Sequence, residues 1–92
     1  MKITVTKEIK DLLEYAFNEF VRLNAIDDGK CALDDDMPDL CCLYTEDWED
    51  ATGISTAPFF YEEDYPTELD IDDSLADLLI RYERGWEKVL AR

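Results

Sequence analysis

Residues 6–26 read TKEIKDLLEYAFNEFVRLNAI, and this stretch predicts the longest helix of the chain. Its apolar residues recur at spacings of three and four, which places them on one face of a helix. They are Ile9, Leu12, Leu13, Ala16, Phe17, Phe20, Leu23 and either Ala25 or Ile26. Thr6 is a suitable N-cap, and Gly29 suits the left-handed position after a helix C-terminus.

A second helix is predicted at roughly residues 37–52, where apolar residues again fall three or four apart. They are Met37, Leu40 or Cys41, Tyr44, Trp48 and Ala51. Asp36 is a plausible N-cap, Pro38 fits the first turn, and Gly53 is a stop signal. A competing interpretation makes Leu40 to Tyr44 a strand paired with Lys30 to Leu33, so that a shorter helix begins at Thr45.

A third helix is predicted from Ser74 to the end of the chain. Ser74 and Asp77 resemble a capping box, and basic residues lie toward the C-terminal end, where the helix dipole favours them. The apolar stripe is Leu75, Leu78, Leu79, Tyr82, Trp86, Val89 and Leu90. Gly85 in mid-helix costs about 1 kcal/mol relative to Ala. We therefore expect Gly85 to lie where another helix or ring packs closely.

The remaining segments leave two questions open. Ile3 and Val5 alternate with polar residues, as in a short strand or an extended lead-in. Residues 53–69 lack a helical period and predict a long loop, in which Phe59, Phe60 and Tyr65 either fill the core or expose one or two rings.

The predicted fold of residues 1–92 is mainly α, a compact three-helix domain with a long acidic and aromatic loop. The alternative is an α+β fold with a small two- or three-stranded sheet.

Composition limits the class of protein. Of the 92 residues 47% are hydrophobic, which is too many for a disordered acidic chain, and the length suits one domain. No stretch approaches the roughly 18 apolar residues of a membrane helix, and no signal peptide is apparent. We expect a soluble protein of the cytoplasm, in a bacterial host, as a monomer or weak homodimer that contacts no membrane.

The chain offers little catalytic chemistry. It has no His, and its three cysteines, Cys31, Cys41 and Cys42, form no Cys-x-x-Cys pair. A zinc site needs four ligands, and a nucleophile needs an adjacent base. Cysteines kept as reduced, buried thiols fit this pattern best. We therefore expect no enzyme activity, no cofactor and no metal site.

Charge is the feature that most needs a cause. Residues 27–73 hold 17 Asp and Glu against one Lys30, a net charge of −16, whereas residues 1–26 are neutral and residues 74–92 carry +1. This sign argues against direct nucleic-acid binding, which requires Lys and Arg to neutralise phosphates. The opposite inference is that the carboxylates imitate a phosphate backbone and occupy the basic surface of a nucleic-acid-binding protein. The alternative is that they only solvate the surface.

The predicted partner contacts are acids and two aromatic rings of this middle segment. They are Asp34, Asp35, Asp36, Asp39, Glu46, Asp47, Glu49, Asp50, Phe60, Tyr61, Glu62, Glu63 and Asp64. The acids would contribute charge, and Phe60 and Tyr61 would serve as anchors if they are exposed.

In size, charge and lack of catalytic motifs the chain resembles the small acidic inhibitors of phages and mobile elements, including anti-CRISPR and anti-restriction proteins. The resemblance implies steric inhibition of a Cas effector, a restriction enzyme or a nuclease, and it assigns no residue roles. Immunity proteins and antitoxins that neutralise nuclease toxins are similar at this level. A non-inhibitory phage structural or assembly protein is a further alternative.

Overall fold

The structure is a computed structural model that describes residues 1–29, 37–60 and 65–91, without the side chains of residues 37–43 and 60. In chain order its elements are β1 (Lys2–Thr4), α1 (Lys7–Asp27), α2 (Met37–Thr52), α3 (Ala57–Phe60), β2 (Glu68–Asp70), α4 (Asp73–Tyr82) and α5 (Gly85–Val89). Helices cover more than half of the chain, which confirms a mainly α fold, and the two strands add the small sheet of the alternative.

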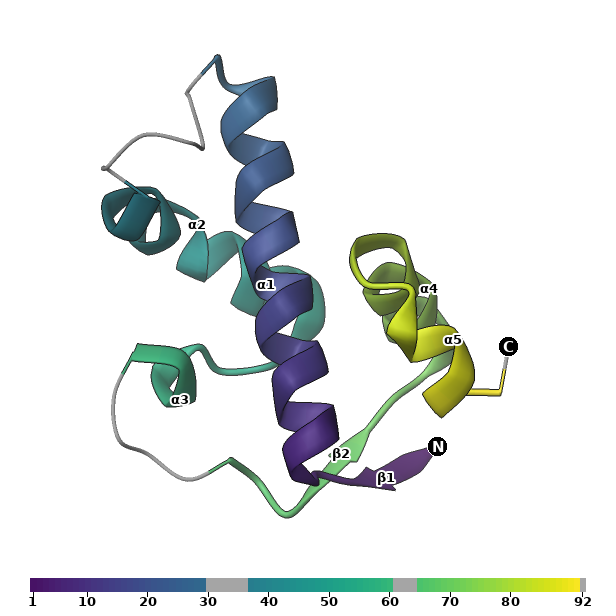
Figure 1. The fold of residues 1–92 in the computed structure, drawn as a ribbon. Coiled ribbons are helices and arrows are strands. Elements are labelled where there is room, and N and C mark those ends of the chain that lie inside the picture. Colours follow the sequence, from purple (N-terminus) through teal and green to yellow (C-terminus); the bar gives the residue numbers. More distant parts are fainter. Residues whose placement is uncertain (30–36, 61–64, 92) are drawn as a thin grey trace.

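Helix α1 is the central element, with α2 on one side and α4 on the other (Figure 1). Its ends are those the sequence predicts, because Thr6 Oγ1 accepts a hydrogen bond from Ile9 N and Gly29 has a φ of +76°. Its buried residues are Ile9, Leu13, Ala16, Phe17, Phe20, Val21 and Ala25. Val21 lies outside the predicted stripe and is nevertheless fully buried. Because α2 and α4 pack against α1 from two sides, the buried face of α1 is wider than the single predicted stripe.

Aromatic rings connect the other helices to α1. Trp48 of α2 is fully buried and packs edge-on against Phe17 and Phe20, with ring centroids 5.5 Å apart in both pairs. Phe59 of α3 stacks on Phe17 at 5.0 Å, and Tyr65 lies 5.9 Å from Phe59. Phe59 and Tyr65 therefore pack against the core, as the first interpretation of the loop predicts, whereas the Phe60 side chain lies outside the described residues.

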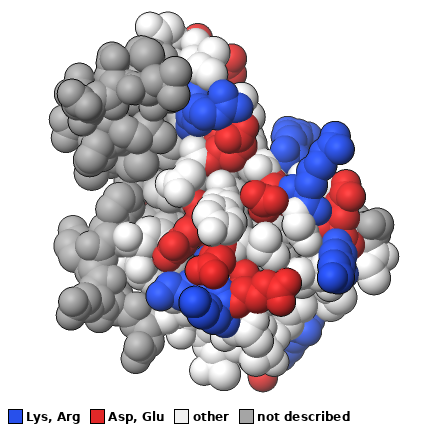
Figure 2. Space-filling view, viewed as in Figure 1, with Lys and Arg blue, Asp and Glu red and all other residues white. Residues whose placement is uncertain are grey.

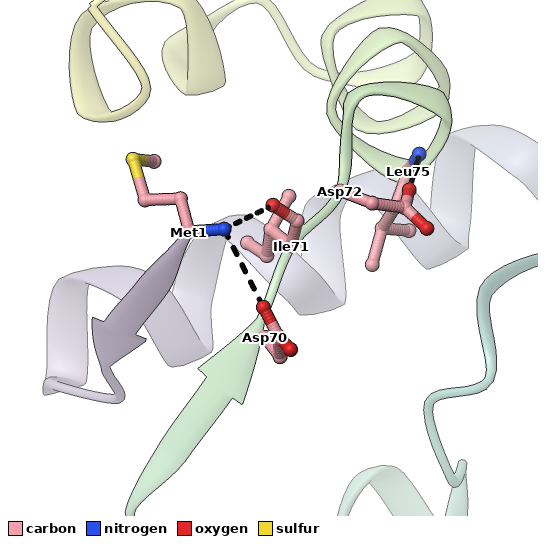
Figure 3. Close-up of polar contacts among 5 residues, drawn as sticks. All are labelled: Met1, Asp70, Ile71, Asp72 and Leu75. Atoms are coloured by element: carbon pink, nitrogen blue, oxygen red, sulfur yellow. Dashed lines mark hydrogen bonds and ion pairs between the residues drawn. The ribbon is translucent and has the colours of Figure 1, made fainter.

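The alternation at Ile3 and Val5 is a strand. β1 pairs antiparallel with β2, with Ile3 opposite Leu69, and Val5 N donates to Thr67 O at 2.9 Å. The ammonium of Met1 continues this pairing by donating to Ile71 O at 3.0 Å, and it lies 3.4 Å from Asp70 Oδ1 (Figure 3). An uninterrupted loop at residues 53–69 was thus a wrong prediction, because this region contains α3 and the first residues of β2.

One continuous C-terminal helix was also a wrong prediction. The backbone is extended at Glu83, which ends α4 and separates it from α5. The Glu83 carboxylate then accepts a hydrogen bond from Gly85 N at 3.1 Å, and Trp86 is turned into the core, where its indole N–H donates to Leu12 O at 3.4 Å. The break turns α5 back beside α4 (Figure 1), and the Trp86 hydrogen bond joins α5 to α1.

The start of α4 also differs from the prediction. Asp72, not Ser74, is the N-cap, since its Oδ1 accepts a hydrogen bond from Leu75 N at 2.8 Å (Figure 3). The cap therefore lies two residues before the predicted Ser74, and Leu75 at the third helical position has no side-chain acceptor to complete a capping box. Choosing Ser74 as the cap was wrong, because Asp72, Asp73 and Ser74 are three adjacent residues that can all cap a helix.

Helix α2 has the predicted bounds, and Gly53 follows it with a φ of +72°. A strand at Leu40 to Tyr44 is therefore wrong, because these residues lie within α2. Its proposed partner, Lys30 to Leu33, and the predicted N-cap Asp36 lie outside the described residues. Among the described helices, none combines the length and the apolar character needed to cross a membrane.

Candidate functional site

The orientation of α2 is fixed by one face that enters the core. Tyr44, Trp48 and Thr52 are buried and follow one another at one-turn spacing. The Thr52 hydroxyl donates to Trp48 O at 2.7 Å and accepts from Ile54 N at 3.1 Å, which secures the C-terminal turn. This anchoring directs four exposed carboxylates away from the core. They form what we call the acidic face of α2, namely Glu46, Asp47, Glu49 and Asp50.

No cation among the described residues offsets the acidic face of α2. The helix contains no Lys or Arg, and none of the four carboxylates takes part in an ion pair with a described residue. Glu49 has one neutral partner, the Thr56 hydroxyl, which donates to Oε1 at 2.8 Å. Like charges one turn apart on a helix repel, and acids near its C-terminus oppose the helix dipole. The arrangement therefore costs stability locally.

One carboxylate at the C-terminal end of α1 is bonded to α2. The Tyr44 hydroxyl donates to Asp28 Oδ2 at 2.5 Å, and this bond is the main reason why the pKa of Tyr44 is raised to about 12. Burial and the charges of Asp28 and Asp47 raise it further. The carboxylate that follows the C-terminal end of α1 is therefore held by α2. The list of predicted contacts does not include Asp28, because its approach to Tyr44 depends on how α1 and α2 pack.

The face on which α1 lies beside α4 and α5 is different in character. Figure 2 shows basic and acidic side chains interspersed there. Arg22 Nε donates to Glu19 Oε2 at 2.9 Å, and this hydrogen bond lowers the pKa of Glu19. The described basic residues are Lys2, Lys7, Lys10, Arg22, Arg81, Arg84 and Lys88. All of them belong to β1, α1, α4, α5 or the turn before α5, so none of the described basic residues lies on α2, α3 or β2.

An apolar cleft of about 470 Å³ lies at the C-terminal end of α2. Its walls come from α1, from the segment that follows α2 and from the approach to β2. They are Leu13, Gly53, Ile54, Ser55, Pro58, Tyr65, Pro66 and Leu69. The Tyr65 hydroxyl donates to Glu14 Oε1 at 2.9 Å, and burial, followed by this bond, raises the Tyr65 pKa. Sequence reasoning missed the cleft because three separate segments form it.

The predicted contacts are thus only partly placed. Glu46, Asp47, Glu49 and Asp50 are brought together on one helix, and Asp39 belongs to the same helix with its side chain outside the described residues. Phe60 ends α3, and its side chain is likewise not described. The remaining predicted contacts lie outside the described residues and stay predictions. They are Asp34, Asp35, Asp36, Tyr61, Glu62, Glu63 and Asp64.

Comparisons of the chain with protein-family models, with curated proteins and with solved structures found no match. The candidate site is therefore defined by geometry. It consists of the acidic face of α2, with Asp28 bonded to Tyr44 of the same helix.

Proposed function

We propose that this chain is a protein inhibitor that binds the basic surface of a nucleic-acid-binding protein through the acidic face of α2. By occupying that surface it excludes DNA or RNA, in the manner of anti-CRISPR or anti-restriction proteins. One observation carries the proposal. Glu46, Asp47, Glu49 and Asp50 are exposed on one helix, and no described cation pairs with them.

The rigidity of α2 supports this role. Trp48 is fully buried, so the carboxylates on the opposite face are held by a packed helix rather than by a free chain. Preorganised groups lose less conformational entropy on binding than flexible ones. Residues 46–50 span about 6 Å of the helix axis and hold four carboxylates, whereas a duplex carries one charge per about 1.7 Å of its axis. Over this short length the charge density of the face is therefore similar to that of a phosphate backbone.

Charge complementarity gives the proposal a measurable signature. The inhibitor and the nucleic acid would neutralise the same Lys and Arg side chains of the partner, so binding of one excludes the other. Both interactions should weaken as salt rises, because screening acts on each.

The test compares two triple variants with the same change in net charge. One neutralises Glu46, Asp47 and Asp50 as E46Q/D47N/D50N and leaves Glu49 to bond Thr56. The control neutralises exposed acids elsewhere as E8Q/E68Q/E87Q. Each immobilised protein captures partners from host lysate, and each purified partner is then titrated with labelled nucleic acid.

The expected partner is retained by wild type and control, is lost from the α2 variant, and releases its nucleic acid when wild type binds. A partner that holds the nucleic acid and this protein at once would contradict the proposal. Equal behaviour of the two triple variants would show that the acids only solvate the surface.

A further inference from the structure

We infer that the solvent-facing side of α1 binds the same side of a second copy of this chain, which gives a weak symmetric dimer. The two α1 helices lie antiparallel about a two-fold axis that passes between residues 20 and 21. This inference goes beyond the proposed function and does not depend on it, because the acidic face of α2 belongs to another element.

The contact surface is a stripe on the exposed side of α1. Tyr15, Glu19, Arg22 and Ile26 follow one another at spacings of four, three and four, so they lie along one side of the helix. We call these four residues the α1 stripe. Tyr15 is 57% exposed and Ile26 is 52% exposed, and they are two of the three exposed large apolar side chains among the described residues.

The order of residues along the α1 stripe is self-complementary. In an antiparallel pair, Glu19 faces Arg22 of the second copy and Tyr15 faces Ile26, because both pairs have the same midpoint in the sequence. The two-fold axis repeats each contact, so opposite charges meet twice at the centre and apolar side chains meet at both ends. A symmetric dimer requires a patch that matches itself in this way.

Charge favours this side of the molecule for self-association. The chain has a net charge of −15, so two copies repel unless they meet where like charges do not face each other. The α1 stripe is neutral, and Arg22 Nε donates to Glu19 Oε2 at 2.9 Å, which holds both charges at its centre. In Figure 1 α1 is the foremost element, and Figure 2 shows basic and acidic side chains interspersed on this side.

The end of α4 and the turn after it extend the contact surface. Tyr15 borders a shallow hollow of about 510 Å³, which Tyr82 and Arg84 also line. The side chain of Ile26 from the second copy meets Tyr15 at this hollow. The α1 stripe spans only about 17 Å of the helix axis, whereas a standard interface buries about 1,200–2,000 Å². We therefore expect a dissociation constant between about 10 μM and 1 mM.

The dimer leaves the acidic face of α2 accessible. Trp48 of α2 packs against Phe17 and Phe20, which belong to the buried side of α1, opposite the α1 stripe. One dimer therefore presents two acidic faces.

Paired charge reversals test the two-fold arrangement. Arg22→Glu leaves two acids in the α1 stripe, and Glu19→Arg leaves two bases. Each variant alone should therefore dimerise at least about tenfold more weakly than wild type. A mixture of the two variants should recover the dimer, because every acid then faces a base of the other copy. A bond within one chain cannot produce this recovery.

Sedimentation velocity over a concentration series measures the dissociation constants. The controls Lys2→Glu and Glu68→Arg make the same changes of charge at exposed positions of the two strands, away from the α1 stripe. Both controls should dimerise like wild type.

The contact between Tyr15 and Ile26 tests the register. Within one chain the two residues lie about 17 Å apart along α1, which is too far for a nuclear Overhauser effect. A filtered spectrum of mixed carbon-13-labelled and unlabelled wild-type protein should therefore show the Tyr15 ring beside an Ile26 methyl group only through the dimer. This measurement decides the matter even if a charge reversal disturbs folding.

Three results would overturn the inference. They are a monomer at about 1 mM protein, a mixture of the two variants that associates no better than its components, and a dimer without the contact between Tyr15 and Ile26. Loss of dimerisation in the two controls as well would show that overall charge, not the α1 stripe, governs association.

Discussion

Gly85 lies where α5 meets α1, and its missing side chain makes the contact possible. A Cβ at this position would lie 2.7 Å from Cδ2 of Leu12. Alanine normally gains up to about 1 kcal/mol over glycine in a helix. Gly85 is the first residue of α5, where this gain is smaller. We expect the clash to outweigh it at the low end of the overpacking range of about 1–3 kcal/mol, because the end of the Leu12 side chain can shift in part. Gly85→Ala should therefore lower the free energy of unfolding, measured by urea denaturation.

The control for Gly85 is the same substitution in a Leu12→Ala background. With the leucine side chain removed, Gly85→Ala should be neutral or stabilising. A stabilising effect of Gly85→Ala in the protein that retains Leu12 would show that α5 does not pack closely on Leu12.

Tyr44 and Tyr65 connect separate segments through their hydroxyl groups and predict a loss of stability at alkaline pH. The pKa of Tyr44 is raised from 10.0 to about 12, first by its bond to Asp28, and the pKa of Tyr65 is raised as well. The folded protein therefore holds both protons more tightly than the unfolded chain. This contribution is complete below the unfolded pKa of about 10 and is lost as pH rises through the folded values.

Urea midpoints at about pH 9 and pH 11 test the tyrosine prediction. Wild type should lose stability between the two values. The double variant Y44F/Y65F should lose less, because it removes these two titrations and leaves the lysines in place. An equal loss in both proteins would contradict the assigned hydroxyl bonds.

At the start of α4, two neighbouring residues offer a direct comparison of caps. Asp72→Ala removes the acceptor of the Leu75 N–H bond and should cost about 0.5–2 kcal/mol of stability. Ser74→Ala should change stability by less than about 0.5 kcal/mol, as for an ordinary surface position. Thermal unfolding followed by circular dichroism measures both. A larger cost at Ser74 would restore the cap predicted from the sequence.

The elements that sequence reasoning recovered are those with long, regular patterns. The bounds of α1 and α2 follow from their apolar spacing and from Gly29 and Gly53. Of the short elements, β1 was one of two open interpretations, whereas α3 and β2 were missed, because three residues at β2 cannot display a period and need β1 as partner. The break between α4 and α5 preserves the apolar spacing from Leu79 to Trp86, so the stripe does not reveal it.

Across the whole molecule, charge is unevenly distributed, and repulsion on the acidic face of α2 has no described cation to offset it. Added sodium chloride should therefore raise the free energy of unfolding, because it screens this repulsion. The variant E46Q/D47N/D50N should be more stable than wild type at low salt and should respond less to salt. A stability independent of salt would show that the carboxylates are too dispersed to interact.

The candidate site could be predicted only where residues that are close in sequence are also close in space. Trp48 marks the buried side of α2, and helical spacing then places Glu46, Asp47, Glu49 and Asp50 away from that side. The approach of Asp28 to Tyr44 and the cleft at Leu69 depend on how distant segments pack, which local patterns do not encode.

The central claim is that the acidic face of α2 and a nucleic acid compete for one basic surface. The most direct measurement is displacement of labelled nucleic acid from the captured partner at about 50 and 200 mM salt, a range over which phosphate contacts weaken strongly. Wild type and E8Q/E68Q/E87Q should displace the nucleic acid, and E46Q/D47N/D50N should require a much higher concentration at the lower salt. Displacement by all three proteins at equal concentrations, or a stable complex of partner, nucleic acid and this protein, would contradict the claim.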